Sequence, residues 1–242
     1  MTERKIVIPG EVVFEGEDFL PGEGTEKQGN KIVALKFGLA EESKNLVRVI
    51  PLSGVYQPRR GNVVIGKVEN ITFNGWVINI NTPENAFLSL MEVPRYVNKD
   101  ELREVMDIGD MVVAKIYSIN KRGIDLSLKL NGMGRLNKGI IIQVNPNKVP
   151  RIIGKEGSMI SLIKDKTKCK ITVGQNGLVW ISGDNVEDEL FAKKAILYIA
   201  ENSLMSGLTD EMEKWFQENG GKEWQLKNSK DQMEEKLMNL ER

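Results

Sequence analysis

Short apolar runs separated by glycine-containing turns fill the first part of the chain and leave no room there for a long helix. Up to residue 57, runs such as KIVIPGEVVF and NLVRVIPLSGVY alternate with turns such as LPGEGTEKQGN. Short apolar runs bounded by glycine and proline are typical of β-strands. The pattern therefore predicts a small β-barrel or sandwich over residues 1–57.

A second series of short runs follows a proline and arginine break at residues 57–61. Its runs predict five strands, and a charged helical stretch, NKDELREVM, interrupts them after the third. Such a series fits a small closed barrel of the OB type, whose strand faces and loops bind oligonucleotides. We predict this barrel over residues 58–130. The five runs are NVVIGKVENI, GWVINI, AFLSL, MVVAKIYSIN and GIDLSLKL.

The third segment, residues 131–205, mixes strands and helices. A strand (KGIIIQV) precedes two short helices, then come two strands (CKITV and LVWIS) and a long helix, VEDELFAKKAILYIAENS. The predicted order is β-α-α-β-β-α, which makes the whole chain a multidomain protein, mainly β with an α+β part. Residues 206–242 are acidic and helical in propensity but broken at Gly220-Gly221, so we expect a helical tail of two short helices, or a mobile tail, with Trp215 and Trp224 as candidate anchors for a partner.

The tetrapeptide Gly154-Lys155-Glu156-Gly157 lies between the two short helices. Glycines lack a Cβ, so a phosphate can approach the main-chain N–H groups at the start of the next helix, whose dipole favours anions. Nine basic residues lie between Arg135 and Lys170 against only Glu156 and Asp165. We expect Lys155, Lys168 and Lys170 to attract phosphate from this basic background; a plain surface turn and a solvated lysine face are the alternatives.

This element order, with IIGKEG between the helices, resembles a KH domain of the eukaryotic type. In that family a GXXG loop clamps the backbone of about four nucleotides. The resemblance therefore implies RNA contact at Gly154, Lys155, Glu156 and Gly157. It also implies an apolar groove for bases beside the loop, formed here by Ile153, Ile160 and Ile171.

The preceding segment also resembles a family. GKVENITFNGWVINI is similar to the opening hairpin of the OB barrel first described in ribosomal protein S-one, and RGIDLSLKL to its closing strand. The resemblance implies an RNA face that includes Lys67, Phe73, Trp76 and Arg122. Alternation along a regular strand puts Phe73 and Trp76 on opposite faces, which leaves open which of them is core. The third-strand aromatic or histidine of the family is replaced by Phe87-Leu88-Ser89.

Residue usage narrows the possible chemistry. The chain has no histidine and one cysteine, Cys169, so the usual His/Cys zinc sets and every His-based triad are excluded. Neither P-loop nor dinucleotide fingerprint is present. We expect no catalytic residue, metal or cofactor. The charged N-terminal run MTERKIVIPGEVVFEGED offers no apolar centre for a signal peptide, so we expect a cytoplasmic protein without membrane contact.

A glycine-rich β module, one OB barrel and one KH domain in this order resemble the RNA-binding cap subunit of the archaeal exosome. The resemblance implies a protein that is not a nuclease. Three copies, or a mixture with the other cap subunit, would sit on a hexameric ring of RNase-PH-like catalytic and non-catalytic subunits, and the N-terminal module would contribute to that contact. The cap would capture single-stranded, A-rich RNA and direct its 3′ end to phosphorolytic sites.

Two other functions stay open on the sequence. Acidic pairs that hold Mg²⁺ would make the chain a nuclease in its own right. A free-standing RNA-binding factor for translation or rRNA maturation would use the same two folds without a ring. Co-purification separates these readings, because only the cap subunit is expected in one large particle with phosphate-dependent exonuclease activity.

Overall fold

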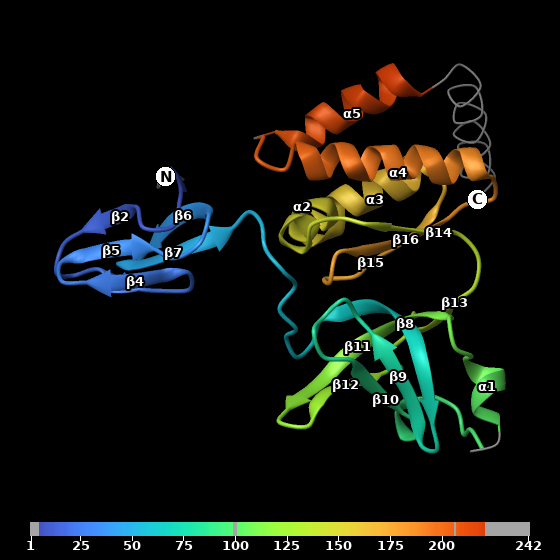
Figure 1. The fold of residues 1–242 in the computed structure, drawn as a ribbon. Coiled ribbons are helices and arrows are strands. Elements are labelled where there is room, and N and C mark those ends of the chain that lie inside the picture. Colours follow the sequence, from blue (N-terminus) through green and yellow to red (C-terminus); the bar gives the residue numbers. More distant parts are fainter. Residues whose placement is uncertain (1–4, 99–100, 206, 221–242) are drawn as a thin grey trace, which may run out of the picture.

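The computed structural model describes residues 5–98, 101–205 and 207–220, and Figure 1 shows three bodies in chain order. The N-terminal body consists of strands and stands beside the other two at the end of an extended segment. Its strands are β1 (Lys5–Val7), β2 (Val12–Glu15), β3 (Leu20–Pro21), β4 (Thr25–Gln28), β5 (Lys31–Ala34), β6 (Gly38–Ser43) and β7 (Leu46–Pro51). One sheet has the order β1-β6-β7-β3 and the other β2-β5-β4.

Alternation along β7 explains the two faces of the larger sheet. Val47 and Val49 are buried, whereas Arg48 and Ile50 on the same strand are exposed. β6 and β7 form a hairpin whose two-residue loop, Lys44–Asn45, has positive φ at both positions (50° and 63°). Such loops match the twist of antiparallel strands. The predicted β module is therefore present as two small sheets over a shared core.

The second body is a closed barrel. Its strands are β8 (Val63–Thr72), β9 (Gly75–Asn79), β10 (Ala86–Ser89), β11 (Met111–Asn120), β12 (Gly123–Ser127) and β13 (Gly134–Leu136), with the helices η1 (Leu90–Glu92) and α1 (Leu102–Val105). The sheet order is β12-β10-β9-β8-β11-β13, and pairing of β12 with β11 closes five strands into the predicted OB barrel. β13, which we had assigned to the third segment, pairs with Met111–Val113 of β11 and so extends the barrel sheet.

The third body has the predicted β-α-α-β-β-α order of a KH domain. Its elements are β14 (Ile140–Gln143), η3 (Pro146–Lys148), α2 (Val149–Ile153), η4 (Lys155–Gly157), α3 (Ser158–Thr167), β15 (Lys170–Val173), β16 (Leu178–Ser182) and α4 (Val186–Glu201). The antiparallel sheet has the order β14-β16-β15, and Figure 1 shows the helices on one side of it. Buried side chains of α2, α3 and α4 form one core with this sheet.

A further helix, α5 (Leu208–Asn219), packs on the KH domain in the region that we had expected to be a separate tail. The Trp215 ring stacks on Phe191 of α4 with 5.4 Å between centroids, and it also contacts Tyr198. The Trp215 ring thus packs within the chain but is only partly buried, so its role as a partner anchor stays a prediction. Trp224 lies outside the described residues. No described helix combines the length and the apolar character needed to cross a membrane.

The β15–β16 turn, Gly174–Gly177, joins the KH domain to the barrel. Asn176 is 2% exposed, and its Nδ2 donates hydrogen bonds to the carbonyl oxygens of Ile65 (2.7 Å) and Ile80 (3.0 Å). Its Oδ1 accepts one from the Ile65 N–H at 3.2 Å. Beside it, the Gln175 Oε1 accepts from the Val63 N–H at 2.6 Å. These bonds span more than 90 residues of sequence and hold the barrel and the KH domain together.

Candidate nucleic-acid interface

The glycine loop between α2 and α3 has a backbone that depends on its glycines. Gly154 has φ 75° and ψ 176°, and Gly157 has φ 82°. A Cβ added at Gly154 would lie 2.7 Å from both N and Cβ of Met159, so a larger residue there would clash with α3. Lys155 and Glu156 between them are exposed, and Glu156 is itself left-handed with φ 54°. The loop therefore presents its two charged side chains to solvent.

The isoleucines beside the loop divide into two groups. Ile153 and Ile160 are partly buried and pack against the KH core, so part of each remains open to a ligand. Ile171 is 4% exposed and belongs to the core itself, because its strand position points to the helices. The expectation that Ile171 lines a base groove is therefore wrong.

Lys168 and Lys170 are exposed, but they are not next to the loop as the sequence suggested. The loop precedes α3, whereas Lys168 ends it as a left-handed C-cap (φ 55°) and Lys170 begins β15. A helix of 10 residues separates the two places, which corresponds to about 15 Å at the usual rise. Lys168 and Lys170 would thus contact phosphates in a different part of a bound RNA strand from the phosphates at the glycine loop.

Phe73 and Trp76 have opposite surroundings in the barrel. Phe73 is 77% exposed at the tip of the β8–β9 hairpin, where a base could stack on it. Trp76 is fully buried in the barrel core, and its Nε1 donates a hydrogen bond to the Met106 carbonyl at 2.9 Å. Placing Trp76 on the RNA face was therefore wrong, since its ring fills the barrel and its one polar atom is already bonded.

Lys67 and Arg122 are both exposed, on β8 and in the β11–β12 turn respectively. Lys67 precedes Phe73 by six positions on one hairpin, which is on the order of 20 Å of extended strand. Its surroundings are not purely positive. Glu69 lies two residues on, and hydrogen bonds from the side-chain amides of Asn79 and Asn85 lower the pKa of its carboxyl.

Two outward aromatic side chains were missed by the sequence reading. Phe87 lies on β10 opposite Val77 of β9 and Asp125 of β12, between the buried Ala86 and Leu88. Because Ala86 and Leu88 on either side are buried, the alternation of the strand turns Phe87 outward. Tyr117 on β11 is 42% exposed. The barrel therefore does carry a third-strand aromatic on its surface.

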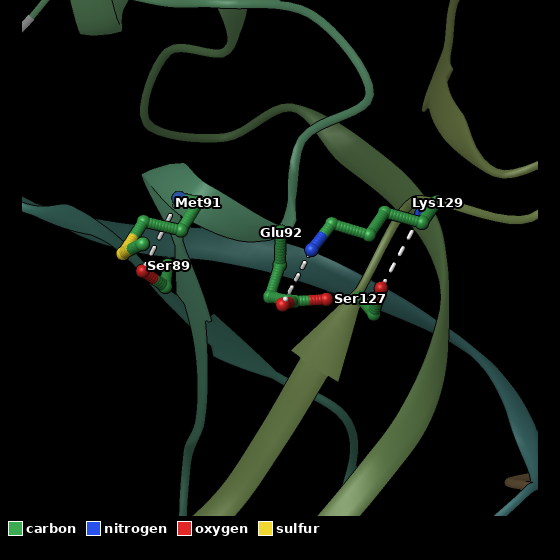
Figure 2. A network of polar contacts seen from close by, with 5 residues as sticks. All are labelled: Ser89, Met91, Glu92, Ser127 and Lys129. Atoms are coloured by element: carbon green, nitrogen blue, oxygen red, sulfur yellow. Dashed lines mark hydrogen bonds and ion pairs between the residues drawn. The ribbon is translucent and has the colours of Figure 1, made fainter.

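A polar network joins η1, which follows β10, to the end of β12 (Figure 2). The Glu92 carboxylate pairs with the Lys129 Nζ at 2.9 Å, and the Lys129 N–H donates to the Ser127 Oγ at 3.3 Å. Burial raises the pKa of the Glu92 carboxyl, but hydrogen bonds from Ser127 and Lys129 outweigh it and hold the pKa below its ordinary value. Glu92 thus stays ionised, and its charge offsets that of Lys129.

The described residues contain no group of three or more Cys, Asp or Glu side chains arranged to hold a metal ion. Cys169 is buried, and burial raises the pKa of its thiol. Its Sγ lies 3.5 Å from the Thr167 carbonyl oxygen. A protonated, buried thiol of this kind is a structural side chain.

Family models match three successive parts of the chain. Residues 4–53 match the exosome RNA binding protein RRP4 N-terminal domain, residues 55–116 the RRP4 S1 domain, and residues 139–187 a KH domain. These matches follow the order of the three bodies.

Curated relatives and a solved structure agree with these three family matches. The exosome complex component Rrp4 of Methanobrevibacter smithii is 42% identical over 213 residues, which is 88% of this chain and 70% of that protein. The Rrp4 of Thermococcus kodakarensis is 41% identical over 220 residues, covering 88% of this chain and 84% of that one. A crystal structure assigned to an exosome complex RNA-binding protein has 35% identity and a TM-score of 0.61, and it covers 68% of this chain and 97% of its own.

Proposed function

The chain belongs to the Rrp4 family of exosome components, and from this premise we propose that it is a non-catalytic cap subunit that captures single-stranded RNA for the exosome. It binds RNA with its S1 barrel and KH domain and directs the 3′ end to phosphorolytic sites elsewhere in the complex. The observation that carries this proposal is the junction at Asn176, which holds two RNA-binding folds as one body. An RNA strand bound by one of these folds is then held close to the other fold.

The RNA contacts that we propose are spread over both folds. On the KH domain they are the loop from Gly154 to Gly157 with Ile153 and Ile160, and at the other end of α3 Lys168 and Lys170. On the barrel they are Phe73, Arg122 and Lys67. Stacking on an exposed aromatic ring contributes about 1–3 kcal/mol per base, and cations supply the salt-dependent part of the affinity.

Changing Lys155 and Glu156 together to aspartate is expected to weaken single-stranded RNA binding. The change replaces a cation in the loop by an anion, and the lost phosphate contact should reduce the salt slope of log K by about 0.7. Stability should change by less than about 1 kcal/mol, because both side chains are exposed. Fluorescence anisotropy over a salt series measures the affinity. Lys214→Asp on the exposed side of α5 is the control, and equal affinity of the loop variant and wild type at every salt concentration would refute the contact.

The outer face of the β1-β6-β7-β3 sheet supports the proposed ring contact. Ile6, Leu39 and Ile50 form one row across three strands, with Ile6 49% and Ile50 38% exposed. A second pair, Leu20 opposite Leu46, is exposed on the same sheet. Clustered apolar side chains on a soluble surface mark an interaction site. We propose that this face meets the RNase-PH-like ring subunits and that the cap contains three such chains or a mixture with the other cap subunit.

The double substitution Ile6→Glu with Ile50→Glu is expected to abolish recovery of this chain with the ring subunits after co-expression. Two charges on either side of Leu39 in the apolar row cannot be desolvated at an interface without a large cost. The wild-type chain should elute in one large particle with phosphate-dependent exonuclease activity. Val186→Glu, at a more exposed apolar position on α4 (67%), is the control and should stay in the particle. If the double variant still elutes with the ring, this face is not the contact.

A further inference from the structure

A β-bulge places Tyr117 on the outside of the barrel. The pairing of β11 with β12 shifts register between Ile116 and Ser118, so Tyr117 is an extra residue without a partner on β12. Ile116 before it is fully buried, whereas Tyr117 is 42% exposed. Bulges are common next to binding sites, where they redirect a side chain. The ring of Tyr117 is therefore presented on the surface.

A shallow groove of about 490 Å³ opens beside this ring, a volume within the range of small-ligand sites. Its lining includes Arg60, Lys115, Tyr117, Ser127 and Leu130. The segment that carries Arg60 is fixed next to β11, because the Gly61 N–H donates to the Ile116 carbonyl at 2.7 Å. The groove thus combines an aromatic ring, an apolar floor and two cations.

Two cations, Arg60 and Lys115, line the groove. In residues 5–98, 101–205 and 207–220, neither Arg60 nor Lys115 forms an ion pair. The nearby acidic groups are already engaged: Glu92 with Lys129, and Asp125 with the Asn120 amide at 2.9 Å. Burial, Asp125 and Glu92 raise the pKa of Tyr117, so its ring stays neutral near neutral pH. Arg60 and Lys115 therefore supply the groove with cations that can contact phosphate, beside the negative charge of Asp125.

The groove lies on the same outer surface of the barrel as the ring of Phe87. Phe87 on β10 pairs with Asp125 on β12, and Asp125 pairs with Ser118 on β11, next to Tyr117. Phe87 and Ser118 are therefore two strand spacings apart, a distance of about 10 Å. A single strand of RNA that passes Phe87 can therefore cross β12 and reach Tyr117 without leaving the barrel.

We propose that the groove is a nucleotide subsite for single-stranded RNA, in which a base stacks on Tyr117 while Arg60 and Lys115 contact the adjoining phosphates. This inference rests on the proposed function and extends the RNA path over the outer face of β11. A protein partner at the same groove is the competing outcome, and the experiment below separates the two.

The test is fluorescence anisotropy with a labelled A-rich single-stranded RNA and four variants. Tyr117→Ala is expected to weaken binding by roughly 5- to 150-fold, whereas Tyr117→Phe, which keeps the ring, should bind like wild type. Tyr117→Leu should behave like alanine, because a leucine side chain keeps apolar volume but has no aromatic face. Arg60→Ala with Lys115→Ala should lower the salt slope of log K by about 1.4.

The outcomes distinguish this inference from the function on which it rests. Failure of the wild-type chain to bind RNA at all would overturn the proposed function. Binding by wild type that Phe73→Ala weakens and Tyr117→Ala leaves unchanged would overturn only the subsite. Retained RNA affinity of Tyr117→Ala with loss from the ring particle would assign the groove to a protein partner. Independently of variant folding, a 4-thiouridine RNA should crosslink to wild-type Tyr117 or its groove, and a crosslink map without them would also overturn the subsite.

Discussion

Replacing Trp76 by alanine is expected to destabilise the chain by about 3–5 kcal/mol. The indole ring is fully buried among the side chains of the barrel, and its Nε1 donates to the Met106 carbonyl. The substitution would leave a large cavity and an unbonded carbonyl oxygen between the barrel and α1. Urea denaturation, followed by circular dichroism, measures the change in the free energy of unfolding.

The control for this prediction is Phe73→Ala, three residues earlier. Phe73 is 77% exposed, so its removal should change the free energy of unfolding by less than about 1 kcal/mol. It should instead weaken RNA binding by the stacking contribution of about 1–3 kcal/mol. The opposite pattern, a stable Trp76→Ala chain with reduced RNA affinity, would restore Trp76 to the RNA face and show that its position in the barrel is misassigned.

Replacing Asn176 by alanine is expected to cost about 2–4 kcal/mol and to loosen the joint between the barrel and the KH domain. The substitution removes three buried hydrogen bonds and leaves the N–H and C=O of Ile65 and the C=O of Ile80 without them. Each buried polar group without a partner costs about 1–3 kcal/mol, which partial access of water reduces. The urea midpoint should fall, and a protease should cut more readily between the barrel and the KH domain.

Asn85→Ala provides a matched control for that substitution. Asn85 is exposed and makes one hydrogen bond, to Glu69, so its loss should change stability by less than about 1 kcal/mol. If Asn176→Ala and Asn85→Ala unfold at the same urea concentration as wild type, the buried amide does not hold the two folds together. The common RNA-binding body that we propose would then lose its structural basis.

Elements with local signals were predictable from the sequence. The two glycines around Lys155 and Glu156, followed by apolar residues at helical spacing, were sufficient to place the loop before α3. The five strands of the barrel were also predictable from its short apolar runs, because strand alternation and glycine turns depend only on neighbouring residues. The order β-α-α-β-β-α then followed from the elements themselves.

Features that depend on contacts distant in sequence were not predictable. β9 and β10 have apolar residues on both faces, including Val77 and Phe87 outside and Trp76 and Leu88 inside, so alternation alone could not identify the core face. The bulge at Tyr117 leaves no sequence mark, since it is a mismatch between two strands.

The turn at Gln175 and Asn176 is the clearest case of a misleading local signal. Its sequence, Gly-Gln-Asn-Gly, is that of an ordinary exposed hairpin loop, but the structure buries Asn176 against the barrel. A Cβ at Gly177 would lie 2.3 Å from the Val144 carbonyl oxygen, so the glycine is required by packing as well as by its φ of 84°. Only the partner strand β8, more than 100 residues away, gives the turn this role.

The central claim, that this chain binds single-stranded RNA without cutting it, is tested most directly by anisotropy of the purified chain with a labelled A-rich RNA, followed by a denaturing gel of the same samples. We expect binding that weakens steadily with salt, and full-length RNA with and without Mg²⁺. Cleavage by the chain alone on addition of Mg²⁺, or no binding at any salt concentration, would contradict it.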